Sequence, residues 1–168
     1  MDIVFKNTYV RNKALFKELY AYYYFGRPLM IVFHILFAIY IPVYLFNIFM
    51  YGWDNLYWSI IFFGIYVFIR IPLYFHQVNT VLKRDRELFD GEISISTVVT
   101  DQYLESIAPD GAVNQLSFEK IKRARQTKNL ILLHTKTNLT FIFRKDGFTQ
   151  GSVDEFKAFI RSKGIKIK

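Results

Sequence analysis

Two long apolar segments dominate the first half of the chain. Residues 29–51 carry no fixed charge, residues 56–75 carry one, Arg70, and residues 52–55 separate the two segments. A helix of 23 residues extends roughly 34 Å, which is enough to cross a bilayer. The remaining chain is too small to bury two helices that are apolar on every side. The pattern therefore predicts transmembrane helices at 29–51 and 56–75, joined as a helical hairpin.

The segments that flank this hairpin are amphipathic. Residues 2–6 alternate weakly and predict a short strand, whereas residues 12–25 place apolar side chains at helical spacing. The aromatic cluster at the end of that helix is typical of an interfacial helix at headgroup depth. We therefore expect residues 1–28 to form an N-terminal strand and interfacial helix. Beyond residue 75, apolar positions among charged ones predict that the second transmembrane helix continues as a cytosolic helix to about residue 90.

From residue 92 the apolar pattern changes to period two, which is typical of strands. A Pro109-Asp110-Gly111 turn separates one pair of predicted strands. Residues 129–135 and 139–144 predict a second hairpin.

The last predicted element is an amphipathic helix. Ser152 and Glu155 have the spacing of a capping box at its start, and Gly164 supplies its end. Antiparallel strands closed by one helix predict an α+β cytosolic domain over residues 91–168.

Charge and composition support a membrane location. The chain carries 22 Lys and Arg against 14 Asp and Glu, a net charge of +8, and yet 52% of its residues are hydrophobic. That combination argues against an ordinary soluble domain and against disorder. The loop between the two spans offers only Asp54, whereas basic residues flank the hairpin on its other side, so we expect a two-span plasma-membrane protein with both termini cytoplasmic. The flanking basic residues are Lys13, Lys17, Arg27, Lys83, Arg84 and Arg86.

The order of these parts resembles the YcxB-like family of small bacterial membrane proteins. The segments that carry the resemblance are VTDQYL at 99–104, LSFEKI at 116–121, NLILL at 129–133, Phe148 and the helix that contains Phe156. The resemblance implies a cytosolic domain of pleckstrin-homology-like type, a curved antiparallel sheet or half-barrel closed by a C-terminal helix. It also implies a family without an assigned biochemical activity.

Three polar residues within the predicted spans are candidates for function: His34, Asn47 and Arg70. Polar groups among lipid tails are costly, so they are functional candidates by default. His34 and Arg70 lie at similar depth and could share one polar pocket. In the structural alternative, Arg70 reaches the headgroups while His34 bonds a backbone carbonyl, and Asn47 hydrogen-bonds across helices or at a homodimer contact.

A second candidate set is a basic run in the predicted cytosolic domain: Lys120, Lys122, Arg123, Arg125 and Lys128. Beneath an anionic leaflet each such cation contributes about 1 kcal/mol, so the run could bind lipid headgroups. Strict strand alternation would put Lys120 and Lys122 on one face and Arg123 and Arg125 on the other unless a bulge intervenes. The structural alternative is a solvated basic face. Nucleic-acid binding is disfavoured, because the nearby aromatic residues have core-like spacing.

No catalytic, metal or cofactor motif is present in the sequence. The chain has no cysteine, and its three histidines are scattered without the spacing of a metal or hydrolase motif. We therefore expect a non-enzymatic membrane protein without a cofactor, whose cytosolic domain binds a protein partner or anionic lipid headgroups. The alternative is a small transporter or channel subunit formed when hairpins oligomerise.

Overall fold

The computed structural model describes residues 3–51, 56–89, 93–108 and 110–168. The expected loop at 52–55, the domain boundary at 91 and Pro109 of the predicted turn lie outside the described residues. The elements, in chain order, are β1 (Phe5–Val10), α1 (Lys13–Tyr24), α2 (Pro28–Tyr51), α3 (Leu56–Leu88), β2 (Ser94–Val99), β3 (Tyr103–Ile107), β4 (Val113–Ser117), the short 3-10 helix η2 (Phe118–Lys120), β5 (Ile121–Gln126), β6 (Leu130–Thr135), β7 (Thr140–Arg144), β8 (Phe148–Gln150) and α4 (Val153–Ser162).

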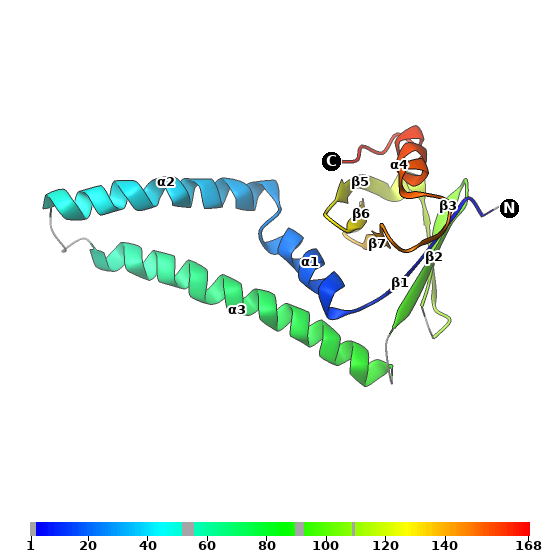
Figure 1. Ribbon diagram of the computed structural model, residues 1–168, viewed down its shortest axis with the longest axis horizontal. Coiled ribbons are helices and arrows are strands. Elements are labelled where there is room, and N and C mark those ends of the chain that lie inside the picture. Colours follow the sequence, from blue (N-terminus) through cyan, green and yellow to red (C-terminus); the bar gives the residue numbers. More distant parts are fainter. Residues whose placement is uncertain (1–2, 52–55, 90–92, 109) are drawn as a thin grey trace. The chain divides into compact units, whose positions relative to one another are not determined.

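The chain divides into two compact units. The sheet unit consists of residues 1–12 and 85–168, and the helical unit consists of residues 13–84. The N-terminal strand therefore belongs to the same unit as the C-terminal domain, and the helical unit is an insertion between β1 and the remaining strands. Figure 1 shows this in colour, because blue β1 lies beside green β2.

The sheet unit contains a five-stranded sheet of order β4-β3-β2-β1-β8 and a three-stranded sheet of order β5-β6-β7. Neighbouring strands are antiparallel in both sheets. Both predicted hairpins are confirmed, as β3–β4 and β6–β7. The predicted strand at 2–6 is real, but it is displaced toward the C-terminus to Phe5–Val10. Polar Asn7 and Thr8 hide its period in the sequence, because Asn7 is buried inside the domain.

One hydrophobic core joins the two sheets and α4. It includes Phe5 of β1, Leu104 of β3, Leu133 of β6, and Phe156 and Ile160 of α4. The rings of Phe5 and Phe156 meet edge to face, with 5.5 Å between their centroids. The predicted capping box is confirmed: the Ser152 side chain accepts from the Glu155 amide, and the Glu155 carboxylate accepts from the Ser152 amide. The first turn of α4 is thereby fixed at the point where its apolar face meets the core.

The side chain of Asn7 links β1 to the end of β7. Its amide nitrogen donates to the Arg144 carbonyl at 2.7 Å, and its amide oxygen accepts from the Arg144 backbone nitrogen at 3.1 Å. Close by, the Thr8 amide donates to the Gly147 carbonyl at 2.8 Å. A Cβ on residue 147 would come within 2.6 Å of the Thr8 carbonyl oxygen, so only glycine allows this approach. Asn7 thus joins the two sheets through polar contacts inside the domain.

The helical unit contains the predicted interfacial helix, α1, and two longer helices. Among the described residues, one helix is long and apolar enough to cross a membrane, namely Met30–Met50 within α2. Its apolar side chains are largely exposed, which distinguishes it from the core helix of a soluble protein. The second predicted span, 56–75, is helical as the first part of α3. Several side chains of that part are outside the description, so the second crossing stays a prediction.

We expect Asn7→Ala to destabilise the sheet unit by about 2–3 kcal/mol, because it removes both bonds between buried Asn7 and the Arg144 amide and carbonyl. The measurement is the melting temperature of the full chain in detergent. The probe is a fluorophore attached to a single cysteine that replaces exposed Gln115. The absence of native cysteine makes the label specific. The matched control is Asn114→Ala, on exposed β4, which should melt like the parent. Equal melting temperatures for both variants would contradict the role of Asn7.

Candidate functional site

The basic run lies along β5 and the segments at either end of it. Lys120 ends η2, Lys122, Arg123 and Arg125 lie in β5, and Lys128 lies in the turn before β6. A β-bulge interrupts the register between Ile121 and Arg123, which pair with Thr135 and His134 respectively. Lys122 is thus an extra residue on the bulged strand.

The bulge keeps the basic side chains of β5 outside the core. Ile121 and Ala124 are buried, whereas Lys122 and Arg123 between them are both exposed. The separation of Lys122 from Arg123 that strict alternation predicts therefore does not occur. Arg125 is half-buried, and Lys120 and Lys128 are exposed.

One acid, exposed Glu119, directly precedes the run, and none lies within it. Residues 120–145 contain neither Asp nor Glu. In the part of the chain that the structure describes, none of the five basic side chains of the run makes an ion pair. A group of cations with an excess of positive charge can attract an anionic partner, and salt screens that attraction.

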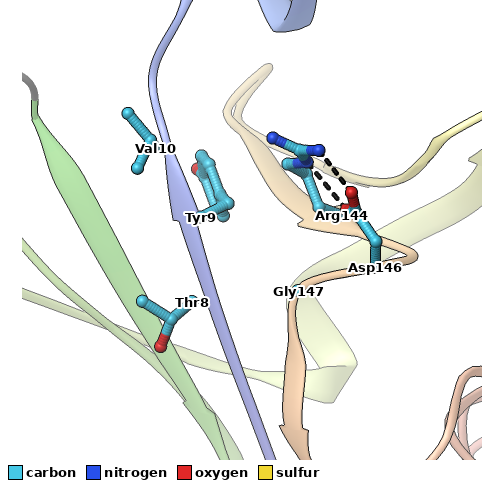
Figure 2. A pocket seen from close by; sticks show the side chains of 6 residues that line it. All are labelled: Thr8, Tyr9, Val10, Arg144, Asp146 and Gly147. Atoms are coloured by element: carbon cyan, nitrogen blue, oxygen red, sulfur yellow. Dashed lines mark hydrogen bonds and ion pairs between the residues drawn. The ribbon is translucent and has the colours of Figure 1, made fainter.

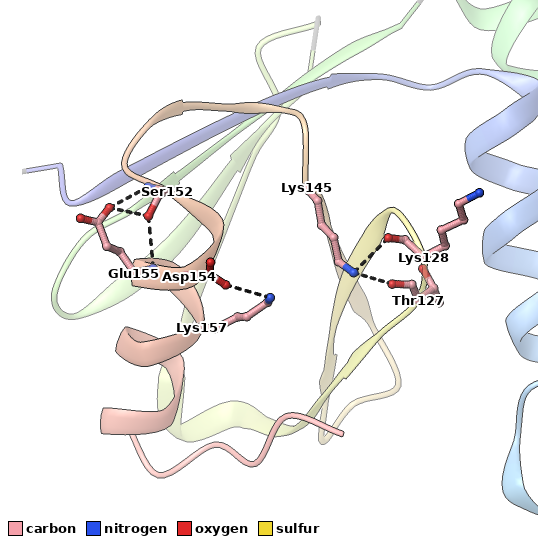
Figure 3. A network of polar contacts seen from close by, with 7 residues as sticks. All are labelled: Thr127, Lys128, Lys145, Ser152, Asp154, Glu155 and Lys157. Carbon is pink, nitrogen blue, oxygen red and sulfur yellow. Dashed lines mark hydrogen bonds and ion pairs between the residues drawn. The ribbon is translucent and has the colours of Figure 1, made fainter.

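Lys145, at the end of β7, is a cation of a different kind. Its ammonium donates to the carbonyl oxygens of Thr127 at 2.6 Å and Lys128 at 3.0 Å. Figure 3 shows it reaching the β5–β6 turn, opposite the capping box of α4. Lys145 therefore supports the turn that presents Lys128, and its charge is already bonded to protein carbonyls.

The sequence reasoning missed the last residues of the chain. Beyond α4, Ala124 forms a parallel bridge with Ile167, so the segment 165–168, here called the tail, lies along β5. The Ala124 amide donates to the Lys166 carbonyl at 3.1 Å, and the Lys168 amide donates to the Ala124 carbonyl at 3.2 Å. The Ile-Lys-Ile-Lys alternation of the tail is a short strand signal.

The intramembrane polar candidates differ in their partners. Arg70 donates to the Tyr24 carbonyl at 3.2 Å and to the Met30 sulfur at 2.9 Å. The His34 ring nitrogen lies 2.5 Å from the Met30 carbonyl, one turn earlier in α2. Arg70 and His34 thus converge on Met30, with Arg70 at the C-terminal end of α1, where a cation is favoured. Asn47 lies apart from them, with an exposed side chain on α2.

A small pocket of about 230 Å³ lies at the junction of β1 and β7. Figure 2 shows Thr8, Tyr9 and Val10 on one side and Arg144, Asp146 and Gly147 on the other. The Arg144 guanidinium forms a two-point ion pair with the Asp146 carboxylate. Arg144 is the basic residue of the described lining, and its charge is balanced by Asp146. The lining therefore has no excess charge with which to select a charged ligand. Among the described residues no group of three or more His, Asp or Glu side chains could hold a metal ion.

Comparison with known proteins finds a match to one protein family. The family model described as YcxB-like protein matches residues 99–160, from the end of β2 to α4. The resemblance predicted from the sequence is confirmed for this part of the chain. No curated protein and no solved structure matches the chain.

The buried phenol of Tyr9 makes the sheet unit sensitive to alkaline pH. Burial raises the pKa of Tyr9 from 10.0 to about 12, against a smaller opposite effect of Arg11. Folding therefore favours the neutral phenol, so its contribution is complete below pH 10 and is lost as pH rises toward 12. Since one pKa unit corresponds to about 1.4 kcal/mol, the loss is roughly 2–3 kcal/mol.

We expect Tyr9→Phe to reduce the fall in melting temperature across that alkaline range, measured with the same label at residue 115. Tyr103→Phe, which replaces the other tyrosine of the sheet unit, is the control and should keep the parent's pH dependence. An unchanged alkaline profile for Tyr9→Phe would show that another group controls it.

Proposed function

We propose that this chain is a non-enzymatic membrane-anchored module whose sheet unit binds anionic lipid headgroups at the cytoplasmic face of the plasma membrane. The observation that carries the proposal is the basic run, whose five cations lack ion pairs among the described residues. It belongs to a chain with a helix that is apolar enough to cross a bilayer. Such a helix keeps the cations close to phospholipid, where each contributes about 1 kcal/mol.

The topology of the sheet unit supports a two-span anchor. β1 pairs with β2 along its whole length, from Phe5 opposite Val99 to Val10 opposite Ser94. The chain must therefore leave the sheet unit after residue 12 and return to it at residue 85 on the same side of any membrane. An even number of crossings follows. Met30–Met50 supplies one, and the apolar start of α3 supplies the other.

Charge asymmetry supports the cytoplasmic side. The residues just outside the proposed hairpin include Lys17 and Arg27 before it and Lys83 and Arg84 after it. Positively charged flanks are retained on the cytoplasmic side of membranes. Two antiparallel sheets around one core with a C-terminal helix also fit the proposed pleckstrin-homology-like half-barrel. That fold type belongs to the proposal and gives no function by itself.

The intramembrane contacts favour this module over a transporter. A transporter would need Arg70, His34 or Asn47 to line a polar path. Arg70 bonds the end of α1 at Tyr24, and His34 bonds the Met30 carbonyl within its own helix. Both contacts satisfy polar groups locally, as expected for side chains that stabilise the entry to the membrane.

Docking of the sheet unit to its own bilayer tests the proposal. The full chain is placed in nanodiscs of phosphatidylcholine, with or without phosphatidylglycerol, and carries a fluorophore on a single cysteine at exposed Gln126, next to the basic run. Lipids with a headgroup nitroxide should quench this label more strongly in the anionic discs, and high salt should reverse the effect. The same label at Gln115 on β4, in the other sheet, serves as the reference position.

The triple variant Lys120→Gln, Lys122→Gln, Lys128→Gln should weaken docking by roughly 2–3 kcal/mol, because it removes three near-surface cations. Its control replaces three exposed or partly exposed cations elsewhere in the sheet unit: Lys6→Gln, Lys157→Gln and Arg161→Gln. If quenching is the same in neutral and anionic discs for the parent and both variants, the lipid-binding proposal is wrong. The search would then turn to a protein partner.

A further inference from the structure

The tail lies parallel to β5, through the Ala124–Ile167 bridge and the backbone hydrogen bonds beside it. Gly164, with a φ of 78°, ends α4, and the Ile165 amide then donates to the Ile160 carbonyl at 3.2 Å. This left-handed residue turns the chain back toward the sheet, as at many helix ends. Ile165 joins the core, and Ile167 packs against it. The apolar residues of the tail thus fix its position along β5.

The register places two lysines of the tail beside two arginines of β5. Ile167 pairs with Ala124, and both side chains are on the core side. Because paired residues share a face and neighbours alternate, Lys166 lies beside Arg123 and Lys168 beside Arg125 on the outer face. Adjacent strands are about 4.8 Å apart, so these four basic residues form a compact cluster.

One row of this outer face extends across the whole sheet. Arg123 pairs with His134 of β6, and His134 pairs with Thr140 of β7. The His134 ring nitrogen lies 3.0 Å from the Thr140 hydroxyl. The row therefore runs from Lys166 and Arg123 to an imidazole and a hydroxyl that contact each other, so its phosphate-binding groups are the two cations.

Four cations in neighbouring positions repel one another, and like charges opposite each other destabilise a sheet. No acid in residues 120–145 or 164–168 offsets this repulsion. Arg123, Lys166 and Lys168 are exposed, and none of the four makes an ion pair in the described residues. The Arg125 Nε atom is buried, and no hydrogen-bond acceptor for it exists in the same part of the chain. The cluster therefore has the chemistry of an anion-binding surface.

We propose that Lys166 and Lys168 of the tail join Arg123 and Arg125 in one surface that binds the phosphate groups of anionic lipids. This inference rests on the proposed function and names further residues that carry it out. The arginines suit bidentate contacts to phosphate oxygens, and the lysines add positive charge along the same edge. The bilayer that holds the helical unit supplies a dense array of such phosphates.

The docking measurement in nanodiscs tests this surface directly. Lys166→Gln with Lys168→Gln should lower the docking equilibrium constant roughly tenfold in anionic discs, and Arg123→Gln with Arg125→Gln should lower it at least as much. The double control Lys6→Gln with Arg161→Gln makes the same change in net charge away from the surface, and it should have a much smaller effect. Lys166→Arg with Lys168→Arg should retain docking, because the charge is kept.

The outcomes separate this inference from the proposed function. Loss of docking in the arginine variant with none in the tail variant would overturn the role of the tail and leave lipid binding in place. If both variants dock as the parent does, and docking of the parent is the same in neutral and anionic discs, both proposals are wrong. Amide hydrogen exchange at Ala124 and Lys168 shows whether the tail stays paired with β5 in the glutamine variant of the tail. Protection equal to that of the parent would assign weaker docking to the lost charge and not to a detached tail.

Discussion

The structure depends on the insertion of β1 between β2 and β8. This strand comes before the helical unit in the sequence, yet both of its edges are bonded within the sheet unit. Its buried Asn7 also bonds the end of β7, so the second sheet is tied to the same strand. A strand in that position cannot be supplied from the far side of a membrane. Under the proposed anchor, the chain must therefore leave and re-enter the sheet unit on one side of the membrane.

A second long-range contact of the sheet unit also involves the segment just after β1. Arg11, just after β1, forms an ion pair of 3.0 Å with Asp85 near the end of α3. Asp85 is almost fully buried, so its charge is stabilised by a close partner and not by water. Three further acids of the sheet unit pair with cations outside the basic surface: Asp101 with Lys163, Asp146 with Arg144, and Asp154 with Lys157. The outer face of β5 and the tail is left with cations only.

The sequence predicted those elements whose signals are local. Two hairpins, the capping box and the end of α4 at Gly164 each depend on a few adjacent residues, and all are present. Cytoplasmic termini permit an N-terminal strand to join the C-terminal sheet, but its place between β2 and β8 could not be predicted. Its partners lie beyond the helical unit, and Asn7 interrupts the apolar pattern of the strand. The bulge in β5 was equally hidden, since its cause is a register fixed by β6. The tail was missed because four residues form a strand only beside an existing edge.

In the proposed function, attachment to the membrane lowers the intrinsic affinity that the basic surface needs. A site in free solution needs high intrinsic affinity, whereas a tethered domain meets its lipid at an effective concentration in the millimolar range. A few cations that contribute about 1 kcal/mol each are then sufficient for substantial occupancy. Because each contribution is small and screened by salt, occupancy would follow the anionic lipid content of the bilayer gradually. A cluster of exposed cations suits such a graded response better than a single buried phosphate site would. Here the cluster consists of Arg123, Arg125, Lys166 and Lys168, which repel one another along one edge.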